Sequence, residues 1–124
     1  MDKRVLIDDD HAPIRGLIRE FIELRPGIKV CGEASDGFEG IEKGLELKPD
    51  AIILDFSMPR MNGLQAALML HEMSPNTPLI LFTMYNDAVM NRLARNVGIA
   101  SVISKTDQLA RLADEVQRLT EWAN

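Results

Sequence analysis

The sequence predicts one α/β domain, spanning residues 1–124, built on a five-stranded parallel sheet with helices on both faces, a doubly wound arrangement. Two observations support this fold class. Short apolar runs alternate with longer segments whose apolar residues recur at helical spacing. The 124 residues are 46% hydrophobic, so the chain can bury one core without disulfide bonds. Regular alternation of strands and helices indicates parallel strands joined by right-handed crossovers.

The first strand and helix are defined by apolar residues and by prolines. Val5–Ile7 is a short apolar run that ends in acidic residues. Pro13–Leu24 carries apolar side chains three and four residues apart, as a helix packed on one face requires. Pro13 suits the first helical turn, and Pro26-Gly27 should end the helix. Ile28–Ala34, which alternates in part, is the second predicted strand.

The second helix, from about Phe38 to Leu47, is bounded by a capping residue and a proline. Ser35 or Asp36 can cap it at its beginning. Pro49 should follow its end, because the residue before a proline avoids helical geometry. Ala51–Leu54 is then a continuous apolar run, which is typical of a central strand covered on both faces.

The rest of the chain repeats this alternation. A loop from Asp55 to Gly63 leads into a helix that ends near Met73. Gly98 is the predicted stop of the helix that follows. The remaining predicted elements are the strand Leu79–Phe82, a helix capped by Asn86 or Asp87 that runs to about Val97, the strand Ser101–Ser104, and a last helix capped by Asp107 that reaches about Trp122.

Charge and composition exclude several classes of function. The net charge of −5 argues against nucleic-acid binding by this chain, because phosphate contacts need a basic face. No apolar run approaches the length that spans a membrane. The N-terminus shows no signal-peptide core, and the single Cys31 excludes an internal disulfide. These features predict a cytoplasmic protein.

Polar residues follow the ends of four predicted strands. Asp8–Asp10 follow the first strand, Asp55 the third, Thr83 the fourth and Ser104-Lys105 the fifth. In open parallel sheets, ligands bind beyond the carboxyl ends of the strands, where the strand order reverses. We therefore expect these side chains to gather in one acidic pocket.

Such a pocket suits a magnesium ion and phosphoryl transfer. Clustered carboxylates repel one another unless a cation lies among them, and hard oxygen ligands suit Mg²⁺. An Asp carboxylate can act as a nucleophile and form an aspartyl phosphate. A Lys ammonium and a Thr hydroxyl can then bind the phosphoryl oxygens. Each residue alone would be an ordinary strand-end residue, so the prediction depends on their joint placement.

Four motifs, in this order and spacing, carry a resemblance to a known family. They are Val5-Leu6-Ile7 followed by acids, the loop Leu54-Asp55-Phe56-Ser57-Met58-Pro59-Arg60-Met61-Asn62-Gly63, Phe82-Thr83, and Ile103-Ser104-Lys105. Over essentially its whole length the chain resembles a response-regulator receiver domain of two-component signalling. The acid–His start and the Met-Pro-x-Met-x-Gly loop are most similar to receivers attached to helix-turn-helix output domains.

The resemblance implies a fold, a cofactor and a set of site residues. The fold is a flavodoxin-like three-layer sandwich with strand order 2-1-3-4-5, and the cofactor is Mg²⁺. The implied site residues are Asp55 as the phosphoacceptor, Asp9 and Asp10 as the acidic pair with Asp10 the more direct metal ligand, Asp55 and the backbone carbonyl of Ser57 as further metal ligands, and Thr83 and Lys105 as the groups that bind phosphoryl oxygens.

The resemblance also implies a signalling switch that catalyses only its own phosphorylation and dephosphorylation, rather than a metabolic enzyme. The phosphoryl donor would be a sensor histidine kinase or a phosphotransfer protein, and the face around the fourth and fifth strand–helix units would change its binding. A homodimer is compatible with the resemblance, whereas membrane contacts and direct nucleic-acid binding by this domain are not expected. The chain is either a stand-alone receiver or part of a longer regulator with a DNA-binding output domain.

Three positions depart from the family pattern. Asp8 occupies a place that is usually apolar and makes the acidic pair ambiguous, although the spacing to Ile14-Arg15 favours the next two acids. Because adjacent strand side chains point to opposite faces, a core-facing Asp8 should be hydrogen-bonded or neutral. Val102 replaces an aromatic switch residue. Thr106 replaces the proline after the lysine, so we expect a trans bond there.

Two residues after the fourth strand should control access to the pocket. Met84 and Tyr85 follow Thr83 at its mouth. We expect Met84 to narrow the entrance and Tyr85 to shield the phosphoryl group from water. The predicted consequence is slow self-dephosphorylation.

Other functions compete with a phosphoacceptor switch. A degenerate receiver that works as a phosphorylation-independent interaction module is favoured modestly by Asp8, Val102 and Thr106. A magnesium-dependent phosphohydrolase is disfavoured, because no further general acid–base or cap insertion is evident. His11 is disfavoured as a metal ligand or phosphohistidine, because no second His or Cys lies at ligand spacing.

Overall fold

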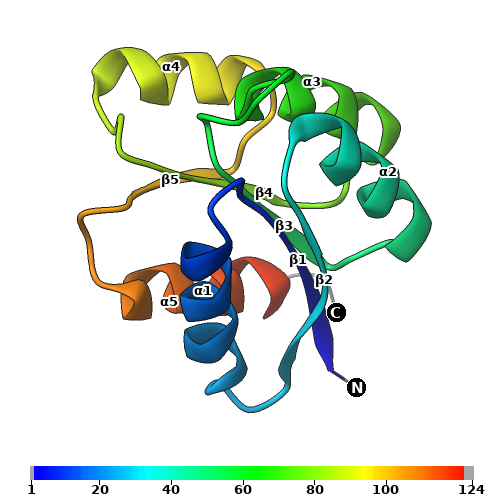
Figure 1. Ribbon diagram of the computed structural model, residues 1–124, viewed down its shortest axis with the longest axis vertical. Coiled ribbons are helices and arrows are strands. Elements are labelled where there is room, and N and C mark those ends of the chain that lie inside the picture. Colours follow the sequence, from blue (N-terminus) through cyan, green and yellow to red (C-terminus); the bar gives the residue numbers. More distant parts are fainter. Residues whose placement is uncertain (1, 122–124) are drawn as a thin grey trace.

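The computed structural model describes residues 2–121, which form one five-stranded sheet with helices on both faces (Figure 1). The strand order is β2-β1-β3-β4-β5 and every pairing is parallel, which confirms the predicted fold class and order. The strands are β1 (Lys3–Asp8), β2 (Ile28–Ala34), β3 (Ala51–Leu54), β4 (Leu79–Thr83) and β5 (Ser101–Ser104). The helices are α1 (Ala12–Glu23), α2 (Gly37–Leu47), α3 (Gly63–Met73), α4 (Ala88–Asn96) and α5 (Leu109–Glu121).

Alternation along the strands divides the interior into two cores. Val5 and Ile7 of β1 pack with α1 and α5, whereas Leu6 between them packs on the side of α2, α3 and α4. Figure 1 shows α1 and α5 together on one side of the sheet and α2, α3 and α4 on the other. Both central strands, β3 and β4, are buried along their whole length. These two strands can therefore be approached only from their amino or carboxyl ends.

Side-chain caps set the beginning of two helices as predicted from the sequence. Asp36 caps α2 and Asp87 caps α4, each accepting a hydrogen bond from a backbone N–H three residues further on. The alternatives Ser35 and Asn86 do not hold these cap positions. In α1 the structure places Pro13 in the first turn, as its fixed backbone angle favours.

The predicted cap of the last helix is wrong. Asp107 was expected to cap it, but α5 begins at Leu109. The Asp107 N–H instead donates to the Ser104 carbonyl at 3.0 Å, so the chain at this point forms a turn before it becomes helical. The predicted end of the helix, Trp122, lies outside the described residues.

Candidate functional site

Charged side chains from three strand ends meet at the carboxyl edge of the sheet. Asp9 and Asp10 follow β1, Asp55 follows β3, and Lys105 follows β5. The Lys105 Nζ lies 2.8 Å from Oδ2 of Asp9 and 3.2 Å from Oδ1 of Asp55. Asp9 and Asp55 are buried, whereas Asp10 is exposed. The sheet order thus brings together the acidic residues and the lysine that lie far apart in the sequence.

The backbone around Asp55 is held on two sides. Its N–H donates to the Asp8 carbonyl at 2.9 Å, which ties the end of β3 to β1. The loop after it returns so closely that a Cβ on Gly63 would lie 2.2 Å from the Asp55 carbonyl oxygen. Only glycine fits at that distance. Gly63 thus lets α3 begin in direct contact with the backbone of Asp55, the predicted phosphoacceptor.

The three acidic side chains suit a hard divalent cation. Asp9, Asp10 and Asp55 can each offer one carboxylate oxygen, and these oxygens lie within 4.8 Å of one another. Mg²⁺ is bound by one or two carboxylates while it keeps several waters, and the exposed Asp10 leaves the site open to them. A donor set of oxygens alone fits Mg²⁺ better than a metal that prefers sulfur or imidazole.

The pocket carries more negative than positive charge. Burial and the nearby charge of Asp9 raise the pKa of Asp55 to about 6, although Lys105 opposes this shift. Burial alone would lower the pKa of Lys105, but hydrogen bonds and charges from Asp9 and Asp55 raise it. One ammonium therefore faces two buried carboxylates, with Asp10 beside them. A divalent cation would relieve the remaining repulsion.

Thr83 and Ser57, the other predicted site residues, belong to the same edge. Thr83 is buried at the end of β4, where its hydroxyl accepts the Tyr85 N–H at 3.1 Å. Its carbonyl accepts the Lys105 N–H at 2.8 Å. Ser57 lies two residues after Asp55, in the loop before α3, and its side chain is exposed. The roles of both residues stay predictions.

Comparison with known families decides what kind of domain this is. The model of the response regulator receiver domain matches residues 5–117. The chain belongs to the response regulator receiver family. It is therefore a signalling domain of two-component systems.

The receiver is similar to proteins of different lengths. It is 35% identical to the chemotaxis protein CheY of Thermotoga maritima, over 98% of the chain and all of that protein. It is also 35% identical to the transcriptional regulatory protein LiaR of Bacillus subtilis, over 92% of the chain but only 54% of LiaR. Among solved structures, a LuxR-family two-component response regulator from Aurantimonas sp. aligns with a TM-score of 0.93 at 25% identity, over 98% of this chain and 87% of that one.

Asp8 of this receiver lies outside the pocket. It follows Leu6 on the side of the sheet that faces α2, and it is fully buried. Neither carboxyl oxygen has a hydrogen-bond partner among the described residues. Burial, followed by the charges of Asp36 and Glu39, raises its pKa to about 8. Of the two expectations for a core-facing Asp8, hydrogen-bonded or neutral, the raised pKa favours the neutral form.

The departures at Val102 and Thr106 introduce no cis peptide bond. Every peptide bond among residues 2–121 is trans, including the bond between Lys105 and Thr106, as expected. The Thr106 hydroxyl pairs with the Ser104 hydroxyl at 2.7 Å. Val102 is half-buried against the core on the side of α4.

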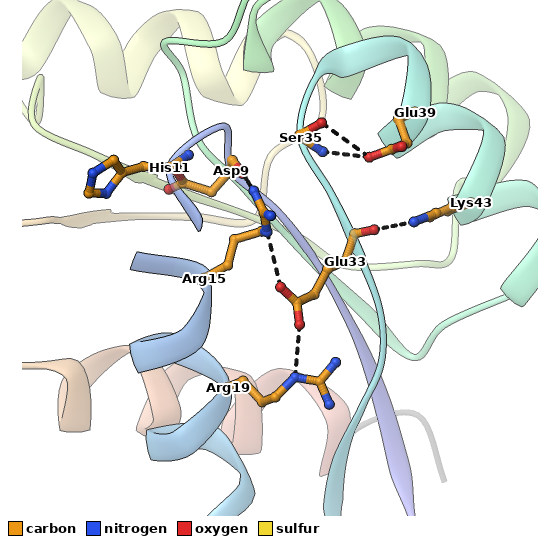
Figure 2. Close-up of polar contacts among 8 residues, drawn as sticks. All are labelled: Asp9, His11, Arg15, Arg19, Glu33, Ser35, Glu39 and Lys43. Carbon is orange, nitrogen blue, oxygen red and sulfur yellow. Dashed lines mark hydrogen bonds and ion pairs between the residues drawn. The ribbon is translucent and has the colours of Figure 1, made fainter. Parts of the chain in front are cut away.

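Two further residues, Arg15 and Glu33, lie next to the acidic loop, although the sequence did not predict them there. Arg15 of α1 contacts both the Asp9 backbone and Glu33 of β2, as Figure 2 shows. Arg15 and Glu33 are 18 positions apart, so no local spacing relates them. The signal in the sequence was Glu33, an acid near the end of the second predicted strand, which the predicted strand order places beside the first strand.

Proposed function

We propose that Asp55 accepts a phosphoryl group from a histidine kinase or a phosphotransfer protein, and that this changes which partners the receiver binds. In this proposal Asp9, Asp10, Asp55 and the backbone carbonyl of Ser57 hold Mg²⁺. The observation that supports it most is the position of Lys105, whose ammonium contacts the carboxylates of Asp9 and Asp55 at once. The oxygens of the three acids converge beside it.

The proposed chemistry uses the Asp55 carboxylate as the nucleophile. One of its oxygens forms a bond to phosphorus while the bond from phosphorus to the donor nitrogen breaks, and the electron pair stays with that nitrogen. Bound Mg²⁺ would neutralise charge on the transferring group. Lys105, already in contact with Asp55, would bind one phosphoryl oxygen. The Thr83 hydroxyl can donate to another while it accepts the Tyr85 N–H, because a hydroxyl does both.

The proposal extends to the extent, location and partners of the receiver. We take it to span residues 1–124, to act in the cytoplasm, and to modify no substrate other than itself. No helix within residues 2–121 is long and apolar enough to cross a membrane. The net charge of −5 argues against direct contacts with nucleic acid. A second copy of the chain is a further proposed partner.

Two arrangements of the whole protein have support. CheY, which the chain matches over that protein's full length, is an example of a protein of receiver length. The match to about half of LiaR, a transcriptional regulatory protein, supports a receiver joined to a DNA-binding output domain. The phosphoacceptor chemistry is the same in both.

Incubation with acetyl phosphate and MgCl₂, followed by intact-mass measurement, tests the proposal. The wild type should gain one phosphoryl group, and Asp55→Asn should gain none. Asp2→Asn is the matched control, because Asp2 is an exposed acid just before β1, at the other end of that strand from the pocket. It should behave like the wild type, and EDTA should abolish the reaction in both.

Two outcomes would contradict this function. Phosphorylation of Asp55→Asn at the wild-type level would place the acceptor elsewhere. A wild type that neither gains mass nor binds Mg²⁺ would favour the phosphorylation-independent interaction module.

A further inference from the structure

Arg15 joins the acidic loop to the neighbouring strand β2. Its Nη1 donates a hydrogen bond to the backbone carbonyl of Asp9 at 2.6 Å, and its Nε donates to Oε1 of Glu33 at 3.0 Å. Figure 2 shows the guanidinium directed at these two acceptors. The Arg15 side chain is only 19% exposed. The planar fork of the guanidinium fixes both hydrogen bonds at once.

Glu33 is a firm anchor for Arg15, because two helices hold it. Its Oε2 accepts a hydrogen bond from Arg19 Nε at 2.9 Å, and its backbone carbonyl accepts one from Lys43 Nζ of α2. Burial alone would raise the pKa of Glu33, but hydrogen bonds from Arg15 and Arg19 lower it. Glu33 therefore stays a carboxylate and makes a charge-assisted pair with Arg15.

The carbonyl that Arg15 holds belongs to the peptide group between Asp9 and Asp10. Because a peptide group is planar, fixing its oxygen also fixes the nitrogen of Asp10 and the direction of the chain at that residue. The Asp9 side chain is held separately, by the His11 N–H at 2.9 Å and by Lys105. Asp10 is exposed, so the backbone of the loop is what aims its carboxylate.

We propose that Arg15 is a positioning residue for the metal site: through the Asp9 carbonyl, and anchored by Glu33, it keeps the Asp10 carboxylate aimed at the cation. This inference rests on the proposed role of Asp9 and Asp10 as metal ligands. Arg15 itself contacts the backbone and not the carboxylates of these two residues. Its effect on the ion is therefore indirect, like that of other outer groups that orient metal ligands.

Arg19 provides a matched comparison within the same helix. It carries the same charge and binds the same Glu33, but its bonds go to Glu33 and Glu23 rather than to the acidic loop. Losing Arg19 should therefore remove one charge and one Glu33 contact without freeing the Asp9 carbonyl. Losing Arg15 should also remove one charge and one Glu33 contact, but in addition it should free the Asp9 carbonyl.

The test measures Mg²⁺ binding to the unphosphorylated protein by calorimetry, together with the metal-free Tm. Arg15→Met should weaken Mg²⁺ binding about tenfold or more, whereas Arg19→Met should stay close to wild type. Arg15→Lys keeps the charge but lacks a fork that reaches both acceptors, so it should not restore binding. A merely structural role would lower the Tm of both Met variants and leave their Mg²⁺ affinities alike.

Glu33→Gln is a second variant that keeps the shape of the anchor, and it should weaken Mg²⁺ binding in the same direction. If Arg15→Met fails to fold, the Mg²⁺ affinity of Glu33→Gln tests the inference instead. Wild-type affinity in every Arg15 and Glu33 variant that folds would overturn the inference, and so would equal losses in Arg15→Met and Arg19→Met. No phosphodonor is present in this assay. A failed phosphorylation of the wild type would therefore overturn the proposed function, whereas unchanged Mg²⁺ affinities would overturn only the role of Arg15.

Discussion

Gly40 of α2 lies against the buried carboxyl group of Asp8, so closely that a Cβ at residue 40 would be 1.8 Å from Asp8 Oδ2. No pair of non-bonded heavy atoms tolerates that distance. The carboxyl group of Asp8 has no hydrogen-bond partner among the described residues. The absence of a side chain at Gly40 is therefore what makes room for the acid.

Gly40→Ala should destabilise the receiver, although alanine is the better helix former. The new methyl group overlaps the Asp8 oxygen, and the free energy of unfolding should fall by about 1–3 kcal/mol, as in other overpacked cores. Gly16→Ala in α1 is the control, because nothing lies within 4 Å of its Cβ position. It should be stabilising by about 0.5–1 kcal/mol. Urea unfolding measures both changes.

The same clash can be relieved from the other side. In an Asp8→Ala background the carboxyl group is gone, so Gly40→Ala should lose most of its effect on the free energy of unfolding. An equal loss of stability in both backgrounds would show that Gly40 is required for a reason other than Asp8.

Asp8→Val should stabilise the receiver more at high pH than at low pH. Folding raises the pKa of Asp8 from 3.8 to about 8, so the charged form is disfavoured in the folded state. The resulting penalty is absent below about pH 4, grows as the pH rises toward 8, and is constant above it. The gain from Asp8→Val should reach the order of a few kcal/mol above about pH 8 and be much smaller near pH 5. The free energy of unfolding is measured in EDTA at several pH values for the wild type and Asp8→Val. If the gain from Asp8→Val were the same at every pH, the raised pKa would be contradicted.

The pocket could be predicted because chain topology assembles it. Asp55 and Lys105 each follow a predicted strand, and the carboxyl ends of parallel strands lie on the same side of a sheet whatever the details of packing. The same reasoning placed Asp10 there. Strand alternation also predicted that Asp8 would face away from its neighbour Asp9. It could not predict that α2 would leave the Asp8 carboxyl group without a partner.

Contacts that depend on how elements pack were not predictable. The bond between Arg15 and Glu33 requires a particular rotation of α1 against β2, which apolar periodicity does not fix to one residue. The turn in which Asp107 bonds to Ser104 delays α5 by one residue, and Asp is common both in turns and at helix caps. Local chemistry alone could not choose between these two roles.

Lys105→Met should bind Mg²⁺ more tightly than the wild type and accept a phosphoryl group more slowly. The ammonium contacts the carboxylates of Asp9 and Asp55, so its removal leaves them more negative and should raise Mg²⁺ affinity roughly threefold to tenfold. The same change removes a cation from the developing phosphoryl charge, which should slow transfer about tenfold or more. Calorimetry and timed intact-mass measurements separate the two effects.

Lys29→Met is the matched control for charge. Lys29 is exposed on β2, and its loss changes the net charge of the receiver by the same amount. It should alter neither Mg²⁺ affinity nor the rate of phosphorylation. If Lys105→Met weakened Mg²⁺ binding, the lysine would have to organise the carboxylates rather than compete with the ion for them.

Tyr85 should protect the phosphorylated receiver from water. Its ring packs edge-on against Phe56, the residue after Asp55, with 5.8 Å between ring centroids. The Tyr85 N–H donates to the Thr83 hydroxyl at 3.1 Å, and this hydrogen bond fixes the backbone from which the ring extends, beside the pocket. Tyr85 is 56% exposed and Met84 61%, so the ring contact with Phe56, rather than burial, distinguishes Tyr85 from its neighbour. Tyr85→Ala should therefore speed the loss of the phosphoryl group by roughly threefold to tenfold, because water gains access to the reacting centre.

The ring, rather than the hydroxyl, should carry this protection. Tyr85→Phe keeps the contact with Phe56 and should lose its phosphoryl group at the wild-type rate, whereas Met84→Ala should show a smaller acceleration than Tyr85→Ala. The rates are measured by removing the phosphodonor from phosphorylated protein in MgCl₂ and following intact mass with time. Rapid loss from the wild type that is unchanged in Tyr85→Ala would mean that water reaches Asp55 by a path that the ring does not cover.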